Sequence, residues 1–200
     1  MDPTPSPTPL HPAATLWPAP CHGGGRTEHG GTTMRYLVRD RMFAFHEEAW
    51  IETEQREKLY RVSRRFLRLR RTFALVDTEG EHVATIVRKA FTFHHTLLIK
   101  QEGQPTAKVS KKLFKLFGDR FKARLGDGRK LRINGNLWDR EFDIRHEDTT
   151  LAHVSRRWFT IRDAYAVDVM SERDALILVI LAVCVDHVIE DAKGDELTNL

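Results

Sequence analysis

Val62-Ser63-Arg64-Arg65-Phe66-Leu67 is the first of four similar motifs that decide how this chain folds. Each motif has a β-branched residue, a spacer, two basic residues and a hydrophobic or aromatic pair, and an apolar residue follows two positions later. The other copies are Ile86-Val87-Arg88-Lys89-Ala90-Phe91, Val109-Ser110-Lys111-Lys112-Leu113-Phe114 and Val154-Ser155-Arg156-Arg157-Trp158-Phe159. Their first residues are 24, 23 and 45 positions apart, so a fifth, weaker copy is expected in the last interval. A repeat of this length is the size of one β-hairpin, and stacked hairpins predict a closed or nearly closed sheet.

Short segments rich in β-branched and aromatic residues alternate with turn residues from position 43 onward. The turn Gly126-Asp127-Gly128 has the glycines of a phosphate loop but neither its full spacing nor a following helix, so we interpret it as a hairpin turn. The spacing predicts about twelve strands. They are expected at Phe43–His46, Ala49–Thr53, Leu59–Ser63, Thr72–Asp77, His82–Arg88, Phe91–Lys100, Thr106–Lys111, Asp119–Leu125, Lys130–Asn136, Glu141–Arg145, Leu151–Arg156 and Tyr165–Val169.

One helix is expected after the last strand, because the eleven residues Ala175–Val185 are all apolar. Ser171 can cap the start of this helix, and the carboxylates of Glu172 and Asp174 interact favourably with the positive end of the helix dipole. The helix should end near Ile189. Apolar residues on every face mean that the helix is surrounded. Crossing a bilayer takes about 20 apolar residues, so the inward faces of the strands are the expected surroundings. The fold class predicted is mainly β: a roughly twelve-stranded antiparallel closed barrel around one buried hydrophobic C-terminal α-helix.

This order of elements resembles the LURP-one-related family. The segments that carry the resemblance are Met34-Arg35-Tyr36, Ala107-Lys108-Val109-Ser110-Lys111-Lys112 before Gly118-Asp119-Arg120-Phe121, Gly135-Asn136, and Asp174-Ala175-Leu176 with Val185-Asp186 around the helix. The resemblance implies a fold similar to the Tubby C-terminal domain and to phospholipid scramblases, over Met34 to about Asp191. It implies little about activity: bacterial and plant members have no established enzymatic activity, plant members are associated with defence responses, and Tubby-like relatives bind phosphoinositides through a basic surface. The calcium-site and palmitoylation motifs of scramblases are not visible in this sequence.

The sequence divides into three parts. Residues 1–33 hold seven of the eight prolines and five of the twelve glycines, which predicts a disordered extension and makes Met34 a candidate for the true initiator. The barrel domain is expected over residues 34–191, with a flexible tail at 192–200. Cys21 lies in the extension and Cys184 in the apolar helix, so no disulfide is expected and a cytoplasmic location is favoured.

Charge is distributed unevenly along the chain. Residues 56–132 carry 21 basic and seven acidic residues, whereas residues 133–200 carry seven basic and fourteen acidic ones. Such a separation indicates either an anionic partner or two halves that neutralise each other in the folded domain. Both interpretations remain open at the level of sequence.

The sequence contains no recognisable catalytic or metal-binding motif. It lacks a nucleophile elbow, a zinc-binding His-Glu-x-x-His, a phosphate loop and a paired Cys-x-x-Cys, so no catalytic residue, metal or cofactor is expected. His94 and His95 are neighbours on an expected strand, where their side chains point to opposite sides. The adjacent pair Asp186 and His187 suggests a catalytic dyad, but a structural role at the exit of the buried helix is favoured. The alternative function is an enzyme with its site at the barrel mouth near these four residues.

The basic pairs are the main candidates for a binding site. Both members of a pair reach solvent only where a strand ends or bulges, so each pair is expected at the end of the first strand of its hairpin. The candidate anion-binding residues are Arg64, Arg65, Arg88, Lys89, Lys111, Lys112, Lys115, Arg156 and Arg157. Such a ring could hold anionic lipid head groups, or each pair could only protect a strand edge and pair with nearby acids. Nucleic acid is disfavoured because the aromatic residues beside the pairs are expected to fill the barrel.

The function predicted from the sequence is therefore a non-catalytic binding or scaffolding module. Its expected partner is anionic membrane lipid or an acidic protein, reached through the basic repeat surface, at the periphery of a membrane rather than within it.

Overall fold

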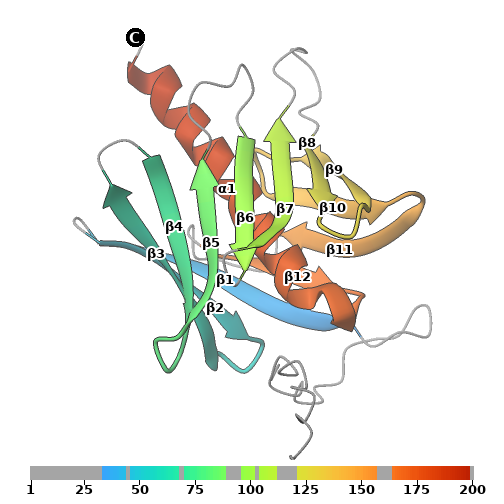
Figure 1. Cartoon of the computed structure of the whole chain (residues 1–200), viewed down its shortest axis with the longest axis horizontal. Helices are drawn as coiled ribbons and strands as arrows, with labels where there is room; N and C mark the ends of the chain where they lie inside the picture. Colours follow the sequence, from blue (N-terminus) through green and yellow to red (C-terminus); the bar gives the residue numbers. More distant parts are fainter. Residues whose placement is uncertain are drawn as a thin grey trace, which may run out of the picture.

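The computed structural model of the chain describes residues 33–43, 46–67, 70–88, 96–101, 104–111, 121–156 and 164–198. Within this part, twelve antiparallel strands follow one another around a closed barrel, and the first strand pairs with the last (Figure 1). The strands are β1 (Met34–Phe43), β2 (His46–Thr53), β3 (Lys58–Leu67), β4 (Arg70–Asp77), β5 (His82–Arg88), β6 (Thr96–Gln101), β7 (Gln104–Lys111), β8 (Phe121–Leu125), β9 (Lys130–Asn136), β10 (Glu141–His146), β11 (Thr149–Ser155) and β12 (Ala164–Val169). A 3-10 turn, η1 (Glu172–Asp174), leads into helix α1 (Ala175–Thr198). The predicted fold class is confirmed.

The repeated motif places one β-branched side chain inside the barrel on every second strand. The first residues of the four motifs, on β3, β5, β7 and β11, are all buried. The expected fifth copy lies on β9, where Ile133 is buried and Gly135-Asn136 stands in place of the basic pair. A further copy begins at Val38 on β1, which is buried and lies 24 positions before Val62. The repeat is therefore a hairpin used six times around the barrel.

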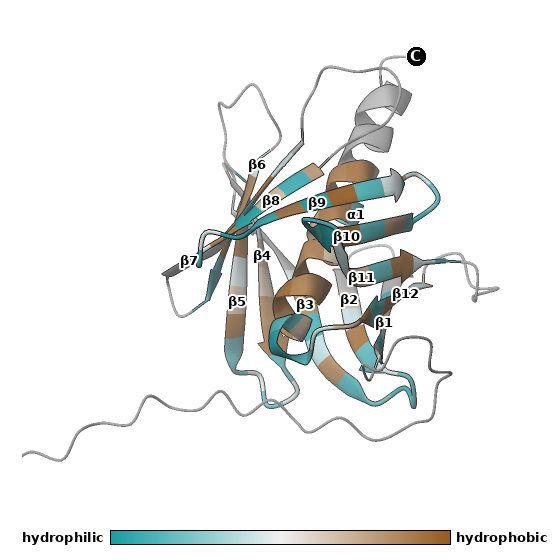
Figure 2. Ribbon diagram, turned by 90° about the vertical axis from the view of Figure 1, so that its right-hand side faces the viewer, coloured by the Kyte–Doolittle hydropathy of each residue, from teal (hydrophilic) through white to brown (hydrophobic). Residues whose placement is uncertain are grey.

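Helix α1 occupies the inside of the barrel, as predicted (Figure 1). Leu178, Leu181 and Val185 are fully buried, and the brown, apolar helix lies among the apolar inward faces of the strands (Figure 2). Cys184 is also buried, and burial raises the pKa of its thiol. Within the part of the chain that the structure describes, no helix combines the length and the apolar content needed to cross a bilayer.

Two boundaries and one helix cap differ from the sequence predictions. The first strand begins at Met34 rather than Phe43, and it was missed because its charged residues obscure the alternation. Ser171 does not cap the helix backbone; its hydroxyl instead donates to the Asp174 carboxylate at 3.1 Å. Helix α1 continues nine residues beyond Ile189, because the segment after it consists mostly of residues that a helix tolerates. The disorder expected for residues 1–33 and the flexibility expected for residues 192–200 stay predictions.

Candidate functional site

The basic pairs gather at one end of the barrel. Strands β3, β5, β7 and β11 run in the same direction, because neighbouring strands are antiparallel. Arg88 ends β5, Lys111 ends β7, and Arg156 directly follows β11. Arg64 and Arg65 differ from the prediction: they lie within β3, which continues to Leu67 and pairs with β4 there without a register shift. We call this end of the barrel the basic rim. The remaining candidate residues, Lys89, Lys112, Lys115 and Arg157, lie outside the described residues.

Closure of the barrel is relevant to the interpretation that the basic pairs protect a strand edge. Each of the described strands has a hydrogen-bonded neighbour on both sides, so the closed sheet they form presents no strand edge to solvent. Protection of an exposed edge against aggregation is therefore not a need of this fold. At Arg156, the backbone N–H donates to the Glu141 carboxylate at 3.1 Å, so the chain leaves β11 in a fixed direction.

The alternative catalytic group is only partly described. Asp186 and His187 are both buried on α1, whereas His94 and His95 lie outside the described residues. Asp186 forms an ion pair with Arg140, which belongs to the turn between β9 and β10 at the basic rim. The His187 ring packs edge-on against Phe73, with 4.1 Å between ring centroids. Asp186 therefore has a structural partner at the basic rim, but it lies within α1 and not at the exit of the helix as expected, because α1 continues to Thr198. Among the described residues, no group of three or more His, Cys, Asp and Glu side chains is placed to hold a metal ion.

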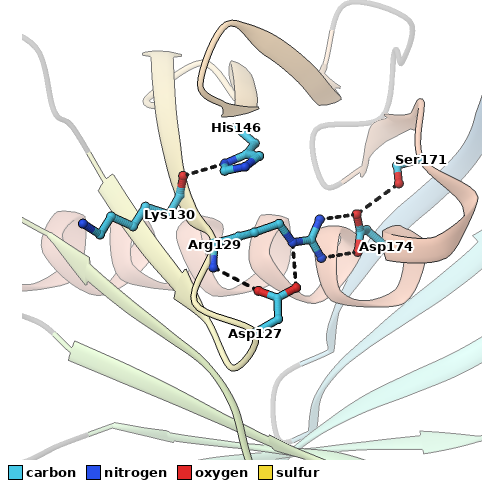
Figure 3. Close-up of polar contacts among 6 residues, drawn as sticks. All are labelled: Asp127, Arg129, Lys130, His146, Ser171 and Asp174. Carbon is cyan, nitrogen blue, oxygen red and sulfur yellow. Dashed lines mark hydrogen bonds and ion pairs between the residues drawn. The ribbon is translucent and has the colours of Figure 1, made fainter.

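A second ion pair anchors α1 at the opposite end of the barrel (Figure 3). The Arg129 guanidinium donates to both oxygens of Asp174, each at 2.7 Å, and also to Asp127 at 2.6 Å. These hydrogen bonds lower the pKa of Asp174, and the Asp174 and Asp127 carboxylates raise the pKa of Arg129. The turn at residues 126–129 therefore holds the start of the helix, and Gly128, with φ of 91°, allows the tight reversal. This confirms the interpretation of Gly126-Asp127-Gly128 as a hairpin turn.

A cluster of cations that was not predicted from the sequence lies on the outer face of β7–β10. In the first row, Lys108 lies opposite Arg124, and Arg124 lies opposite Lys130. In the second row, Arg132 lies opposite both Lys122 and Arg145. All but Arg145, which is half-buried, are exposed. We call these six residues the basic wall.

Few acidic groups accompany the basic wall. Arg132 lies 3.7 Å from the exposed Asp148 carboxylate, and Arg145 donates to the Asp148 backbone carbonyl at 2.7 Å. Within the described part of the chain, no carboxylate pairs with Lys108, Lys122, Arg124 or Lys130. The nearby Asp127 carboxylate is already held by Arg129. The pattern Lys-x-Arg on β8 and again on β9 was visible in the sequence, but which cations face one another depends on strand register.

Outward polar side chains on β10, β11, β12 and β1, which adjoin the basic wall, form pairs. Asp143, His153, Asp168 and Arg35 lie side by side on β10, β11, β12 and β1. Arg35 donates to both oxygens of Asp168, at 2.6 and 3.0 Å, and His153 Nδ1 lies 2.7 Å from Asp143. Neither pair involves the basic segment 56–132; that segment meets the acidic C-terminal third in the ion pair between Arg129 and Asp174.

Comparison with known proteins agrees with this architecture. A family model described as LURP-one-related matches residues 34–186. An uncharacterized protein of Bacillus subtilis (strain 168), YxjI, is 23% identical over 161 residues, covering 80% of this chain and 97% of its own length. The X-ray structure of the Arabidopsis thaliana protein AT5G01750 superposes with a TM-score of 0.53 at 16% identity, covering 78% of this chain and 91% of that one. At this level of identity the solved structure supports the fold alone.

Proposed function

Since this chain belongs to the LURP-one-related family, whose Bacillus subtilis relative is uncharacterized, we propose a function from the charges of the chain itself: a non-catalytic module that binds anionic membrane lipid through its basic rim. The observation that carries the proposal is the convergence of four basic motifs at one end of a barrel whose described strands leave no edge to protect.

The chemistry of the basic rim suits a lipid surface. Each Lys or Arg near an anionic bilayer contributes about 1 kcal/mol, so several cations at one end give useful affinity without a shaped pocket. Trp138 lies in the β9–β10 turn at the same end and is 44% exposed, although large aromatic side chains are usually buried. Tryptophan favours the head-group region of a bilayer, which supports lipid over a soluble acidic protein.

The test is sedimentation of the protein with vesicles, with and without anionic lipid, across a salt titration. Lys111→Glu with Lys112→Glu should weaken binding to anionic vesicles at low salt, where the Debye length exceeds ~10 Å. A matched control is Arg56→Glu with Lys58→Glu, which changes the net charge equally at the opposite end of β3.

The control separates a specific surface from net charge. We expect the control to bind like the wild type and the Lys111/Lys112 variant to bind more weakly, with an unchanged circular dichroism spectrum. Equal binding by all three proteins would remove the rim pair from the site. No binding by the wild type at any salt concentration would overturn the lipid proposal and favour an acidic protein partner.

A further inference from the structure

We propose that the basic wall is itself a membrane-binding surface, so that the barrel lies on its side against an anionic bilayer, with β7–β10 facing the lipid. This inference rests on the proposed function, because it assigns a second and larger surface to the same partner.

The inference is based on like charges that face each other on neighbouring strands. Directly opposed side chains on neighbouring antiparallel strands have Cβ atoms about 4.5–5.5 Å apart, and like charges in that position destabilise a sheet. Arg124 is opposed by Lys108 on one side and by Lys130 on the other. Arg132 is opposed by Lys122 and Arg145 in the same way. A sheet that only needed solubility would gain stability by placing an acid at the centre of either row.

Elsewhere in the same barrel, opposite charges do face each other on neighbouring strands. On β1 and β12, the outward and opposite charges of Arg35 and Asp168 face each other and form two hydrogen bonds. The like-charged rows are therefore a local property of β7–β10 and not a general property of the barrel. A local arrangement that weakens the fold, and that a single substitution would relieve, indicates a binding role.

The surroundings of the wall favour a bilayer over nucleic acid. Directly opposite three of the outer cations lie small, polar or aliphatic residues: Leu98 faces Lys108, Ser110 faces Lys122 and Thr150 faces Arg145. None of these three is an aromatic side chain on which a base could stack, and α1 up to Ile189 is packed inside the barrel, where it cannot enter a groove. Two rows of cations on the outside of four neighbouring strands instead match a broad sheet of negative charge.

The decisive variant is Arg124→Glu. It places an acid between Lys108 and Lys130, so that every opposed pair in the first row has opposite sign. We expect the melting temperature to rise, because two repulsive contacts become attractive. We expect affinity for vesicles containing anionic lipid to fall by about thirtyfold at low salt, since each unit of charge is worth about fivefold. The neutral variant Arg124→Gln should fall between the two proteins in both measurements.

Arg56→Glu is the matched control, because it makes the same change in net charge. Arg56 is exposed in the turn between β2 and β3, on the far side of a barrel whose β8 carries Arg124. This control should bind vesicles nearly as well as the wild type. Vesicle sedimentation and thermal unfolding by circular dichroism measure both properties on the full chain.

The outcomes separate this inference from the proposed function. If the wild type binds anionic vesicles and Arg124→Glu binds equally well, the wall is not the membrane surface, although the basic rim can still be. If Arg124→Glu lowers the melting temperature, the repulsion argument is wrong. If Arg124→Glu keeps vesicle binding but loses binding to a mixed-sequence DNA or RNA duplex, the wall belongs to nucleic acid instead. If the wild type binds no vesicle, both proposals fail together.

Discussion

Of the three described glycines with a positive φ, Gly135 is the one with no room for a side chain. Its φ is 144°, and a Cβ atom added there would lie 2.4 Å from the backbone oxygen of Glu141 and 2.6 Å from the Cα atom of Phe142. Both are backbone atoms of β10, so neither can move without disturbing the sheet. This explains why the fifth motif carries Gly135 where other motifs carry their first basic residue: the close approach of β10 excludes a side chain there.

Replacement of Gly135 by alanine should therefore destabilise the protein by about 2–5 kcal/mol, through overpacking and backbone strain together. The matched control is Gly128→Ala, because Gly128 also has a positive φ, of 91°, but open space around its Cα atom. The control should lose only about 1–2 kcal/mol, the conformational part alone. Urea unfolding followed by circular dichroism measures both values. Equal losses would show that the contact with β10 relaxes without penalty.

Asp174 gives the protein a defined sensitivity to acid. Hydrogen bonds from Arg129 lower its pKa in the folded state, below the value of about 3.9 that an aspartate has in an unfolded chain. The ion pair therefore stabilises the fold above about pH 4, and the contribution disappears as the pH falls through the lower, folded value. Asp174→Asn should reduce the unfolding free energy at pH 7 by about 1–3 kcal/mol. It should also make the loss of stability below pH 4 shallower, as measured by denaturant unfolding from pH 7 to about pH 2.5. An unchanged pH profile would exclude this carboxylate as an acid-labile anchor.

At the scale of elements, the hairpin of β8 and β9 and the turn that follows it hold α1 in place. Arg129, in the turn before β9, pairs with Asp174 at the start of the helix, and Arg140, in the turn after β9, pairs with Asp186 further along it. Arg140 is buried with φ of 56°, and its guanidinium carbon lies 5.5 Å from the centre of the Tyr165 ring. The two charged contacts fix the position of the helix along its own axis. Apolar contacts alone would define this position less sharply, because they are non-directional.

Leu178→Asp tests whether the buried helix supports the whole barrel. Leu178 is fully buried, so the new carboxylate would enter an apolar interior and should cost several kcal/mol, enough to unfold a protein of ordinary stability. Met170→Asp, at a position 45% exposed just before η1, should change stability by no more than about 0.5 kcal/mol. Circular dichroism and size-exclusion chromatography compare the two variants. A folded Leu178→Asp protein would contradict the role assigned to α1.

At the scale of the whole molecule, the barrel turns a linear charge asymmetry into a spatial one. The excess of basic residues in positions 56–132 becomes a wall on one side and a rim at one end. The acidic residues of the C-terminal third act at separate places. Asp174 and Asp186 form ion pairs that hold the helix, and Asp168 pairs with Arg35. The acidic residues therefore contribute to the stability of the fold, whereas the basic residues of the wall and the rim provide the proposed membrane contact.

The sequence by itself was sufficient to predict the hairpin repeat, its fifth copy on β9, and the buried helix. These depend on local patterns: a period of two along a strand, a spacing of about 24 residues, and an apolar run too short for a bilayer. The basic rim was predicted for the same reason, since equivalent positions on parallel strands meet at one end.

Only the tertiary structure decided which charges face one another. Arg35 and Asp168 are 133 positions apart and meet because β1 closes the barrel against β12. The cations of the basic wall face one another because of the register between β7, β8, β9 and β10, whose pairings run without a register shift. A shift by one residue moves every side chain to the other face, so the pairing of strands, and not their composition, determines whether neighbouring charges repel or attract.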